Sequence, residues 1–204
     1  EIHGTEAGWN NVSLGTHALT NLITTVSDSG DNNTAIGNHA LHSNTLGSGN
    51  TANGSHALSN NETGNHNTAS GLSALFKNTS GSENTAIGVE ALYKNTTGKA
   101  NSASGAYALY NHKEGWFNTA SGFHALYKNA EGSRNTASGA SALHDTTGSD
   151  NTATGAFALY YNNGSENTAS GSFALHKNTT GHDNTASGYG ALQFNTTASG
   201  NTAI

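Results

Sequence analysis

The sequence predicts an all-β protein, a single-chain β-solenoid of about eleven coils with 17 residues each. One phrase, N-T-A-S-G-x-x-A-L-x-x-N-T-T-G-S-x, recurs along nearly the whole chain. A fixed internal period of this kind indicates a repeat architecture. Two helices with their turns need roughly thirty residues or more, and glycine at two fixed places in each unit would break a helix. Two short strands joined by two turns fit a unit of this length.

The Asn that opens each unit marks the period. It stands at positions 33, 50, 67, 84, 101, 118, 135, 151, 167, 184 and 201, so every step is 17 residues except two of 16. The two shorter units, which open at Asn135 and Asn151, lose their residue at or beside the second turn. A degenerate copy opens at Asn11 and is followed by five extra residues. We therefore expect a degenerate coil with an insertion over residues 1–32 and the regular solenoid over residues 33–204.

The first strand of each unit is predicted over "NTAS" or "NTAI", and it ends at a glycine such as Gly37 or Gly71. Because side chains alternate along a strand, the Ala points to one face while the Thr and the fourth residue point to the other. The Ala is nearly invariant among the copies, as expected for a cramped interior. The Asn at the first position is expected to form a hydrogen-bonded ladder from coil to coil.

The second strand is predicted around "xALxx", with its Leu as the main core residue of each coil. The candidate core ladder consists of Leu41, Leu58, Leu75, Leu92, Leu109, Leu126, Leu143, Leu159, Leu175 and Leu192. The "NTTGS" segment is the predicted second turn, in which Asn and Gly tolerate a positive φ.

Composition and charge exclude several classes of function. Apolar residues make up 33% of the chain and charged residues 10%, a polar mixture that also occurs in disordered tracts, although the strict period argues against disorder. The net charge is −6 and the 7 basic residues form no cluster, whereas a nucleic-acid groove needs a basic stripe. No apolar run is long enough to span a membrane. We expect no nucleic-acid partner and no membrane span.

No catalytic, metal or cofactor site is expected. His17, His39 and His56 share the seventh repeat position and would stack about 4.8 Å apart on successive coils, but a metal site needs a fixed number and geometry of ligands. The last repeat position holds Glu83, Asp150, Glu166 and Asp183. Acids repeated at a turn are usually solvated, and nothing beside them supplies a nucleophile or an oxyanion donor. We therefore expect that the chain is not an enzyme.

The repeated "NTTG" turn also matches the pattern of glycosylation sequons, and coincidence is the default interpretation because the match follows from the repeat itself. The sequons begin at Asn78, Asn95, Asn178 and Asn195. If the source glycosylates its proteins, these turns are expected to be exposed and to carry glycans along one edge of the solenoid.

Several outward positions suggest self-association. Each coil offers only one Leu and two Ala for burial, so we expect that a partner adds to its stability. The fourth position holds Leu14, Ile36, Ile87 and Ile204. The sites around "AL" hold Phe76, Tyr93, Tyr107, Tyr110, Tyr127, Phe157, Tyr160 and Phe173. An oligomer could bury one of these faces, and a homotrimer is the hypothesis that sedimentation tests.

The phrases "NTAIGNHAL" (33–41), "NTAIGVEAL" (84–92) and "NTASGYGAL" (184–192) resemble the repeats of trimeric autotransporter adhesin heads, the YadA-like left-handed parallel β-roll. The 17-residue form with "ALxxNTTG" is also similar to repeats that precede tail-fibre-type domains in bacterial and phage fibre proteins. The resemblance covers nearly all of residues 11–204 and implies a trimeric, fibrous protein that is extracellular, on a cell surface or in a virion fibre. Most copies have Ser where the adhesin motif has Ile, so the trimer-facing position would be largely polar.

These observations predict an extracellular structural or adhesive fibre module that binds surfaces or glycans through many weak contacts. One alternative is a filament-forming subunit that stacks end to end, because the last unit stops at "NTAI" without a distinct polar cap. The same ending would also fit a segment cut from a longer protein.

A second alternative is ice binding. The Thr at the second position and the Ser at the fourth could form a flat T-x-S array, and regular Thr files on flat solenoid faces are how several antifreeze proteins engage ice. The candidate surface array consists of Thr34, Thr51, Thr68, Thr85, Thr119, Thr136, Thr152, Thr168 and Thr185, and it continues to Thr202. Ser102 replaces Thr once, and the occasional Ile and Asn53 make the fourth-position file imperfect.

Overall fold

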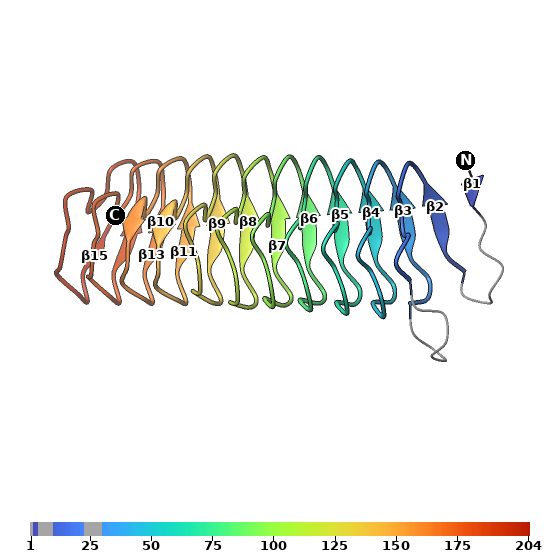
Figure 1. Ribbon diagram of the computed structural model, residues 1–204. Helices are drawn as coiled ribbons and strands as arrows, with labels where there is room; N and C mark the ends of the chain where they lie inside the picture. Colours follow the sequence, from blue (N-terminus) through green and yellow to red (C-terminus); the bar gives the residue numbers. More distant parts are fainter. Residues whose placement is uncertain (1, 4–9, 23–29) are drawn as a thin grey trace.

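The computed structural model describes residues 2–3, 10–22 and 30–204, and it shows an elongated solenoid whose coils stack side by side (Figure 1). The strands β1 and β15 lie at opposite ends of the stack. The described residues form short strands and no helix. The predicted all-β solenoid with a repeat of about 17 residues is therefore confirmed, with about ten regular turns.

The strands are two or three residues long. They are β1 (Ile2–His3), β2 (Val12–Leu14), β3 (Thr34–Ile36), β4 (Thr51–Asn53), β5 (Thr68–Ser70), β6 (Thr85–Ile87), β7 (Ser102–Ser104), β8 (Thr119–Ser121), β9 (Thr136–Ser138), β10 (Asp145–Thr146), β11 (Thr152–Thr154), β12 (Tyr161–Asn162), β13 (Thr168–Ser170), β14 (Thr185–Ser187) and β15 (Thr202–Ala203).

One 13-stranded sheet runs along the whole molecule, with one strand from each coil. All of its strands are parallel except β1, which lies antiparallel on the outer edge of β2. Equivalent residues face each other in register, as Thr119 faces Thr136 and Ala120 faces Ala137. The degenerate coil joins this sheet through β2, while the insertion predicted within residues 1–32 includes residues 23–29, which lie outside the described residues.

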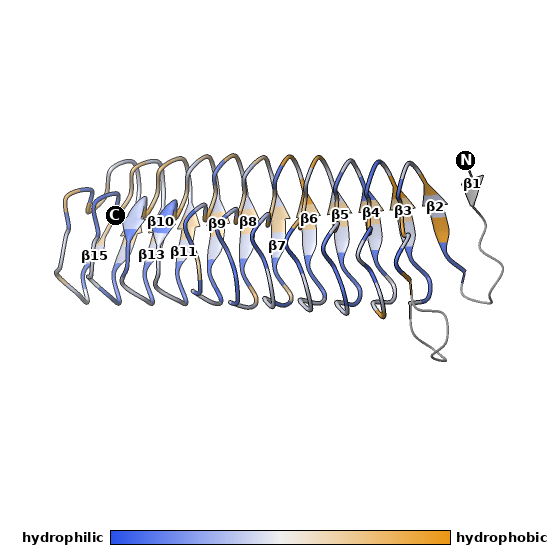
Figure 2. Cartoon of the chain, viewed as in Figure 1, coloured by the Kyte–Doolittle hydropathy of each residue, from blue (hydrophilic) through white to orange (hydrophobic). Residues whose placement is uncertain are grey.

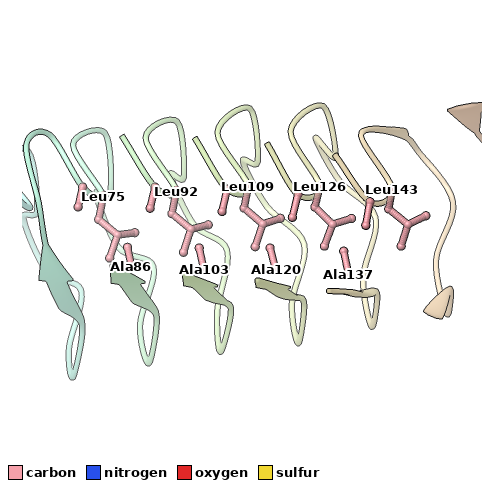
Figure 3. Close-up of a cluster of buried hydrophobic side chains, with 14 of the residues drawn as sticks. Leu75, Ala86, Leu92, Ala103, Leu109, Ala120, Leu126, Ala137 and Leu143 are labelled. Atoms are coloured by element: carbon pink, nitrogen blue, oxygen red, sulfur yellow. The ribbon is translucent and has the colours of Figure 1, made fainter. Parts of the chain in front are cut away.

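The core is a column of small side chains and leucines (Figure 3). In the regular strands the middle Ala is buried and its two neighbours point outward, as alternation along a strand requires. A second Ala and the Leu of each "AL" pair complete the core. The ladder leucines from Leu41 to Leu175 are fully buried, whereas Leu192, in the last coil, is only partly buried.

The second strand predicted around "xALxx" is wrong for most coils, because this segment forms a turn. The residue two before the Leu and the Leu itself take left-handed φ angles, for example 58° at Tyr107 and 52° at Leu109. The coil must close around a core only one Leu and two Ala wide, so the backbone turns here. Hydrogen bonds between coils persist, since Leu109 N donates to Ala125 O over 3.0 Å.

Within the described residues, a second pairing of strands occurs only in the two shorter units. There β10 and β12 pair in parallel, with Asp145 facing Tyr161 and Thr146 facing Asn162. The missing residue lies between these strands and the glycines Gly148 and Gly164. The loss therefore falls at the second turn, as predicted, and the shorter connection leaves the chain extended.

The two glycines of each unit are required for different physical reasons. Gly122, after the first strand, has a φ of 136°, and a Cβ there would lie 2.6 Å from Gly139 O. Gly98, in the second turn, needs no positive φ, but a Cβ there would lie 2.8 Å from Gly115 O. The Asn and Gly of "NTTGS" thus do not use the positive φ that both residue types tolerate. The last residue of the unit takes that conformation instead, with φ values of 62° at Glu83 and 61° at Asp150.

Two columns of buried amides accompany the apolar core. In the first Asn ladder, formed by the Asn at position one, Asn118 N donates to Asn101 Oδ1 over 3.0 Å, as the sequence led us to expect. In the second Asn ladder, formed by the Asn of "NTTG", Asn78 Nδ2 donates to Asn61 Oδ1 over 2.7 Å and to Gly81 O over 2.9 Å. The Asn side chains of the second turn are thus part of the interior.

Candidate functional site

The outer side of the long sheet is the most regular surface of the molecule. It consists of the second and fourth residues of the units that contribute its parallel strands, and we call it the hydroxyl face. The predicted surface array lies on it: Thr51, Thr68, Thr119, Thr136, Thr152, Thr168 and Thr185 are exposed, as are Ser102 and Thr202, while Thr34 and Thr85 are half-buried. In Figure 2 the strands of this face are mostly pale, of intermediate hydropathy, except β2, which is orange.

The register of the sheet turns the hydroxyl face into a two-dimensional array. Thr136 faces Thr119 on one side and Thr152 on the other. Equivalent side chains therefore repeat at about 4.8 Å along the axis. The second residues form one file along the axis and the fourth residues form another, and these two files lie about 6.7 Å apart across each strand. From Val12 to Ile204, neither file contains a charged or an aromatic residue.

The composition of the two files changes along the axis. Exposed apolar residues interrupt the N-terminal part, namely Val12, Leu14, Ile36 and Ile87. From β7 to β14, every second and fourth residue of the long sheet carries a hydroxyl group. We call this set the hydroxyl lattice, and it consists of Ser102, Ser104, Thr119, Ser121, Thr136, Ser138, Thr152, Thr154, Thr168, Ser170, Thr185 and Ser187, all of them exposed.

The hydroxyl groups of the lattice differ from those of several Thr residues at the thirteenth repeat position. At the thirteenth repeat position Thr79 Oγ1 donates to Thr96 O over 3.1 Å, and Thr179 Oγ1 donates to Thr196 O over 2.8 Å. The lattice hydroxyls make no such bond within the described part of the chain. They are therefore available to an external partner.

A second surface feature is the aromatic ladder, formed at the tenth repeat position. It runs through Phe76, Tyr93, Tyr110, Tyr127, His144, Tyr160 and His176. Neighbouring rings lie 4.7 to 5.4 Å apart between centroids, and the first six are nearly parallel. Because the rings cover each other's faces, the ladder strengthens the contact between coils and offers mainly ring edges to solvent.

The histidines of the seventh position stack as predicted. The ring centroids of His17 and His39 lie 4.9 Å apart, those of His39 and His56 lie 5.1 Å apart, and His42 packs 4.9 Å from His39. Desolvation lowers the pKa of His39, and the neighbouring histidines lower it further. Among the described residues there is no group of three or more His, Cys, Asp or Glu side chains arranged to hold a metal ion.

The acids of the last repeat position make local contacts at a turn. Arg134 donates two hydrogen bonds to Asp150, of 2.6 and 2.8 Å, and these lower the pKa of Asp150. A hydrogen bond with Asp183 raises the pKa of Glu166, while the hydrogen bond with His182 lowers that of Asp183. Glu83 lies at the same turn position and is exposed. The acids thus form exposed ion pairs and a shared carboxyl pair along one edge.

A recess of about 370 Å³ lies beside the two shorter coils. It is lined by Asp145, Tyr161, Asn163, Lys177, Thr179 and Thr196. Asp145 already pairs with Lys128 over 2.9 Å, and the Thr179 hydroxyl is bonded to the backbone. The recess therefore follows from the missing residue in the second turn, and part of its polar lining is already paired.

The exposure that glycosylation of the sequon turns would require is not found at their Asn side chains. Asn78, Asn95 and Asn178 are fully buried, and their side-chain amides belong to the second Asn ladder. Asn195, in the last coil, is half-buried and donates to Asn178 Oδ1 over 2.7 Å. In the folded chain these amides face inward, so a transferase cannot reach them.

Three features of the structure were not predicted from the sequence. They are the second Asn ladder, the continuous aromatic ladder and the contrast between paired and free hydroxyls. A signal for the first two existed: a file of Asn or of rings at one repeat position over successive coils predicts stacking, as it did for the histidines. The free hydroxyls depend on which side chains reach a carbonyl group, and spacing alone does not show this.

Comparison with protein-family models finds no match, and comparison with curated proteins finds no relative. The described residues form no helix with the length and hydrophobicity of a membrane span. The surface chemistry of the solenoid is therefore the basis for inferring a function.

Proposed function

We propose that this chain is an extracellular structural and adhesive module that attaches to an extended, regular surface through its hydroxyl face. One observation carries the proposal: the lattice hydroxyls are exposed, aligned in register and free of partners in the described chain. Surfaces rich in hydrogen-bonding groups, such as glycans or a host surface, are the class of partner that fits this chemistry.

Attachment of this kind depends on number rather than on single contacts. One exposed hydroxyl contributes little, but a rigid array presents many hydroxyls to the same surface at once. The strands are held by hydrogen bonds and by the buried column of Ala and Leu, so little conformational freedom is lost on contact. The module would therefore work without a single deep site.

Co-sedimentation with insoluble particles tests the proposal. The panel contains cellulose, chitin and finely divided ice, and the chain is compared with the double variant Thr136→Lys/Thr168→Lys. The matched control is Thr63→Lys/Thr180→Lys, which places the same charges on exposed residues of the second turn. We expect the chain and the control to bind at least one solid and the face variant to bind several-fold less. The proposal is contradicted if the variant Thr136→Lys/Thr168→Lys binds as well as the parent chain, or if the parent chain binds none of the solids.

We also propose that the chain forms a homo-oligomer, with a homotrimer as the first model. Its contact would be the apolar part of the hydroxyl face, where Leu14, Ile36 and Ile87 are 45%, 38% and 49% exposed. The hydroxyl lattice lies in the other half and would stay accessible. Sedimentation equilibrium should show three chains, and Ile36→Asp/Ile87→Asp should give a folded monomer. A monomeric parent chain contradicts the model.

An end-to-end filament is the alternative assembly, and it requires a different contact between chains. The free edge of β15 would have to pair with the other end of the stack, where β1 already lies on β2. Filaments seen by electron microscopy that lengthen when residues 1–9 are removed would support this alternative over the trimer.

A further inference from the structure

The hydroxyl lattice has the hydrogen-bonding chemistry of water. A hydroxyl group both donates and accepts, so it can occupy the position of a water molecule in a hydrogen-bonded network. At the thirteenth repeat position several Thr hydroxyls donate to carbonyl groups of the next coil, as those of Thr79 and Thr179 do. Over six adjacent strands of the long sheet the chain leaves the hydroxyls exposed and unpaired within the described residues. The natural partner of such groups is ordered water.

The backbone fixes the spacing of the lattice. The hydroxyls repeat at about 4.8 Å along the axis and about 6.7 Å across the strand, over a length of roughly 24 Å. These repeats are of the same order as the distances between equivalent oxygen atoms in hexagonal ice. The in-register pairing, such as Thr152 with Thr168 and Thr154 with Ser170, keeps the spacing constant from strand to strand.

The side chains that are missing from the hydroxyl face narrow the class of partner further. An anionic polymer would be met by basic side chains, and a polysaccharide by exposed aromatic faces, but the two files contain neither. The rings of the aromatic ladder belong to another repeat position and cover one another. A flat, uncharged array of hydroxyl and methyl groups is left.

We propose that the surface bound by the hydroxyl lattice is ice, so that the chain adsorbs to ice crystals through β7, β8, β9, β11, β13 and β14. This inference rests on the proposed function and names the solid. The Thr methyl groups would sit between the bound waters, while the hydroxyls complete the hydrogen bonds of the surface layer. The N-terminal part, with Ile36, Asn53 and Ile87 in the fourth-position file, would contribute less.

Thermal hysteresis, ice-crystal shaping and partition into growing ice test the inference. We expect the chain to lower the freezing point below the melting point and to enter the ice phase. Thr136→Lys and Thr168→Lys should each reduce the hysteresis several-fold. Thr63→Lys and Thr180→Lys, on the second turn, should leave most of it. Thr136→Val keeps the β-branched shape and serves as the second variant if Lys disturbs folding, which circular dichroism monitors.

The possible outcomes separate this inference from the proposed function. A chain that binds cellulose or chitin through the hydroxyl face but shows no hysteresis and stays in the liquid phase overturns the ice inference alone. A chain that binds no solid overturns both. Hysteresis that survives Thr136→Lys, Thr168→Lys and Thr136→Val equally well also overturns the inference, because another surface would then be responsible.

Discussion

At the scale of single residues, buried amides determine how one coil lies over the next. In the first Asn ladder, Asn118 N donates to Asn101 Oδ1 of the preceding coil over 3.0 Å, and Asn118 Nδ2 donates to Gly132 O of the same coil over 2.8 Å. A buried polar group without a partner costs about 1–3 kcal/mol. A coil in the wrong register would leave several such groups unpaired, so the ladders select the observed stacking.

The second Asn ladder is interrupted at two places, and both leave polar atoms unpaired. His112 and Thr146 replace Asn, and Asn95 Oδ1, Asn129 Oδ1 and Thr146 Oγ1 are buried without a hydrogen-bond partner among the described residues. His112 adds a further conflict. Both of its ring nitrogens lie 2.9 Å from a backbone carbonyl oxygen, but a neutral imidazole has a single N–H to donate.

We therefore expect His112→Asn to stabilise the chain by about 1–3 kcal/mol. The new amide would donate to Asn95 Oδ1 and accept from Asn129, as the amides of neighbouring coils do. Urea denaturation followed by circular dichroism measures the free energy of unfolding. Thr146→Asn should also stabilise the chain, because the new amide would donate to Asn129 Oδ1. Thr63→Asn, on the exposed turn, should have little effect. A destabilised His112→Asn variant contradicts the interpretation of the ladder.

The histidines also predict how stability depends on pH. Desolvation lowers the pKa of His39, His112 and His124 below the ordinary value of 6.5. Below pH 6.5 the unfolded chain then binds more protons than the folded chain, so stability falls as the pH drops from 6.5 through the lowered pKa values. We expect a constant melting temperature between pH 7 and 8 and a decrease below 6.5. His112→Asn should make this decrease shallower, and an unchanged slope would exclude His112 as a contributor.

At the scale of the element, each coil is a strand, a turn that carries the Leu and a turn that carries the second Asn ladder. The buried Leu leaves a large void if it is shortened, because the coils on both sides hold the backbone in place. Leu109→Ala should therefore cost about 2–5 kcal/mol. Leu192→Ala should cost clearly less, because this side chain is only partly buried. Equal losses in the two variants, measured by urea denaturation, would show that burial does not set the cost.

The sequence predicted some elements of the coil and missed others for physical reasons. Alternation in "NTAS" was enough to place the Ala inside and the Thr array outside. The "xALxx" segment has the composition of a strand, but closing a narrow coil forces Leu109 and its equivalents into left-handed φ angles. The Asn of "NTTG" fits an exposed turn as well as a buried ladder, and only the stacking of coils decides between them.

At the scale of the whole molecule, the solenoid is a one-dimensional stack in which each coil contacts its two neighbours. The Leu column, both Asn ladders and the aromatic ladder all run parallel to the axis. The stability of such a stack is approximately a sum of coil and interface terms. One coil can then be removed without loss of the fold, provided that the register of every column is kept.

Deletion of residues 67–83 removes one complete unit and places Asn84 directly after His66, where Asn67 stood. Asn84 then meets Asn50 and Leu92 meets Leu58, so both columns continue without a gap. We expect a folded chain with an unchanged β spectrum, intact binding through the hydroxyl lattice and a urea m-value reduced roughly in proportion to length. Deletion of residues 67–74 is the matched control. It moves Leu75 into the place of the first-position Asn and puts all columns out of register, so this chain should not fold cooperatively. If both deletions fold equally well, the ladders do not determine the stacking.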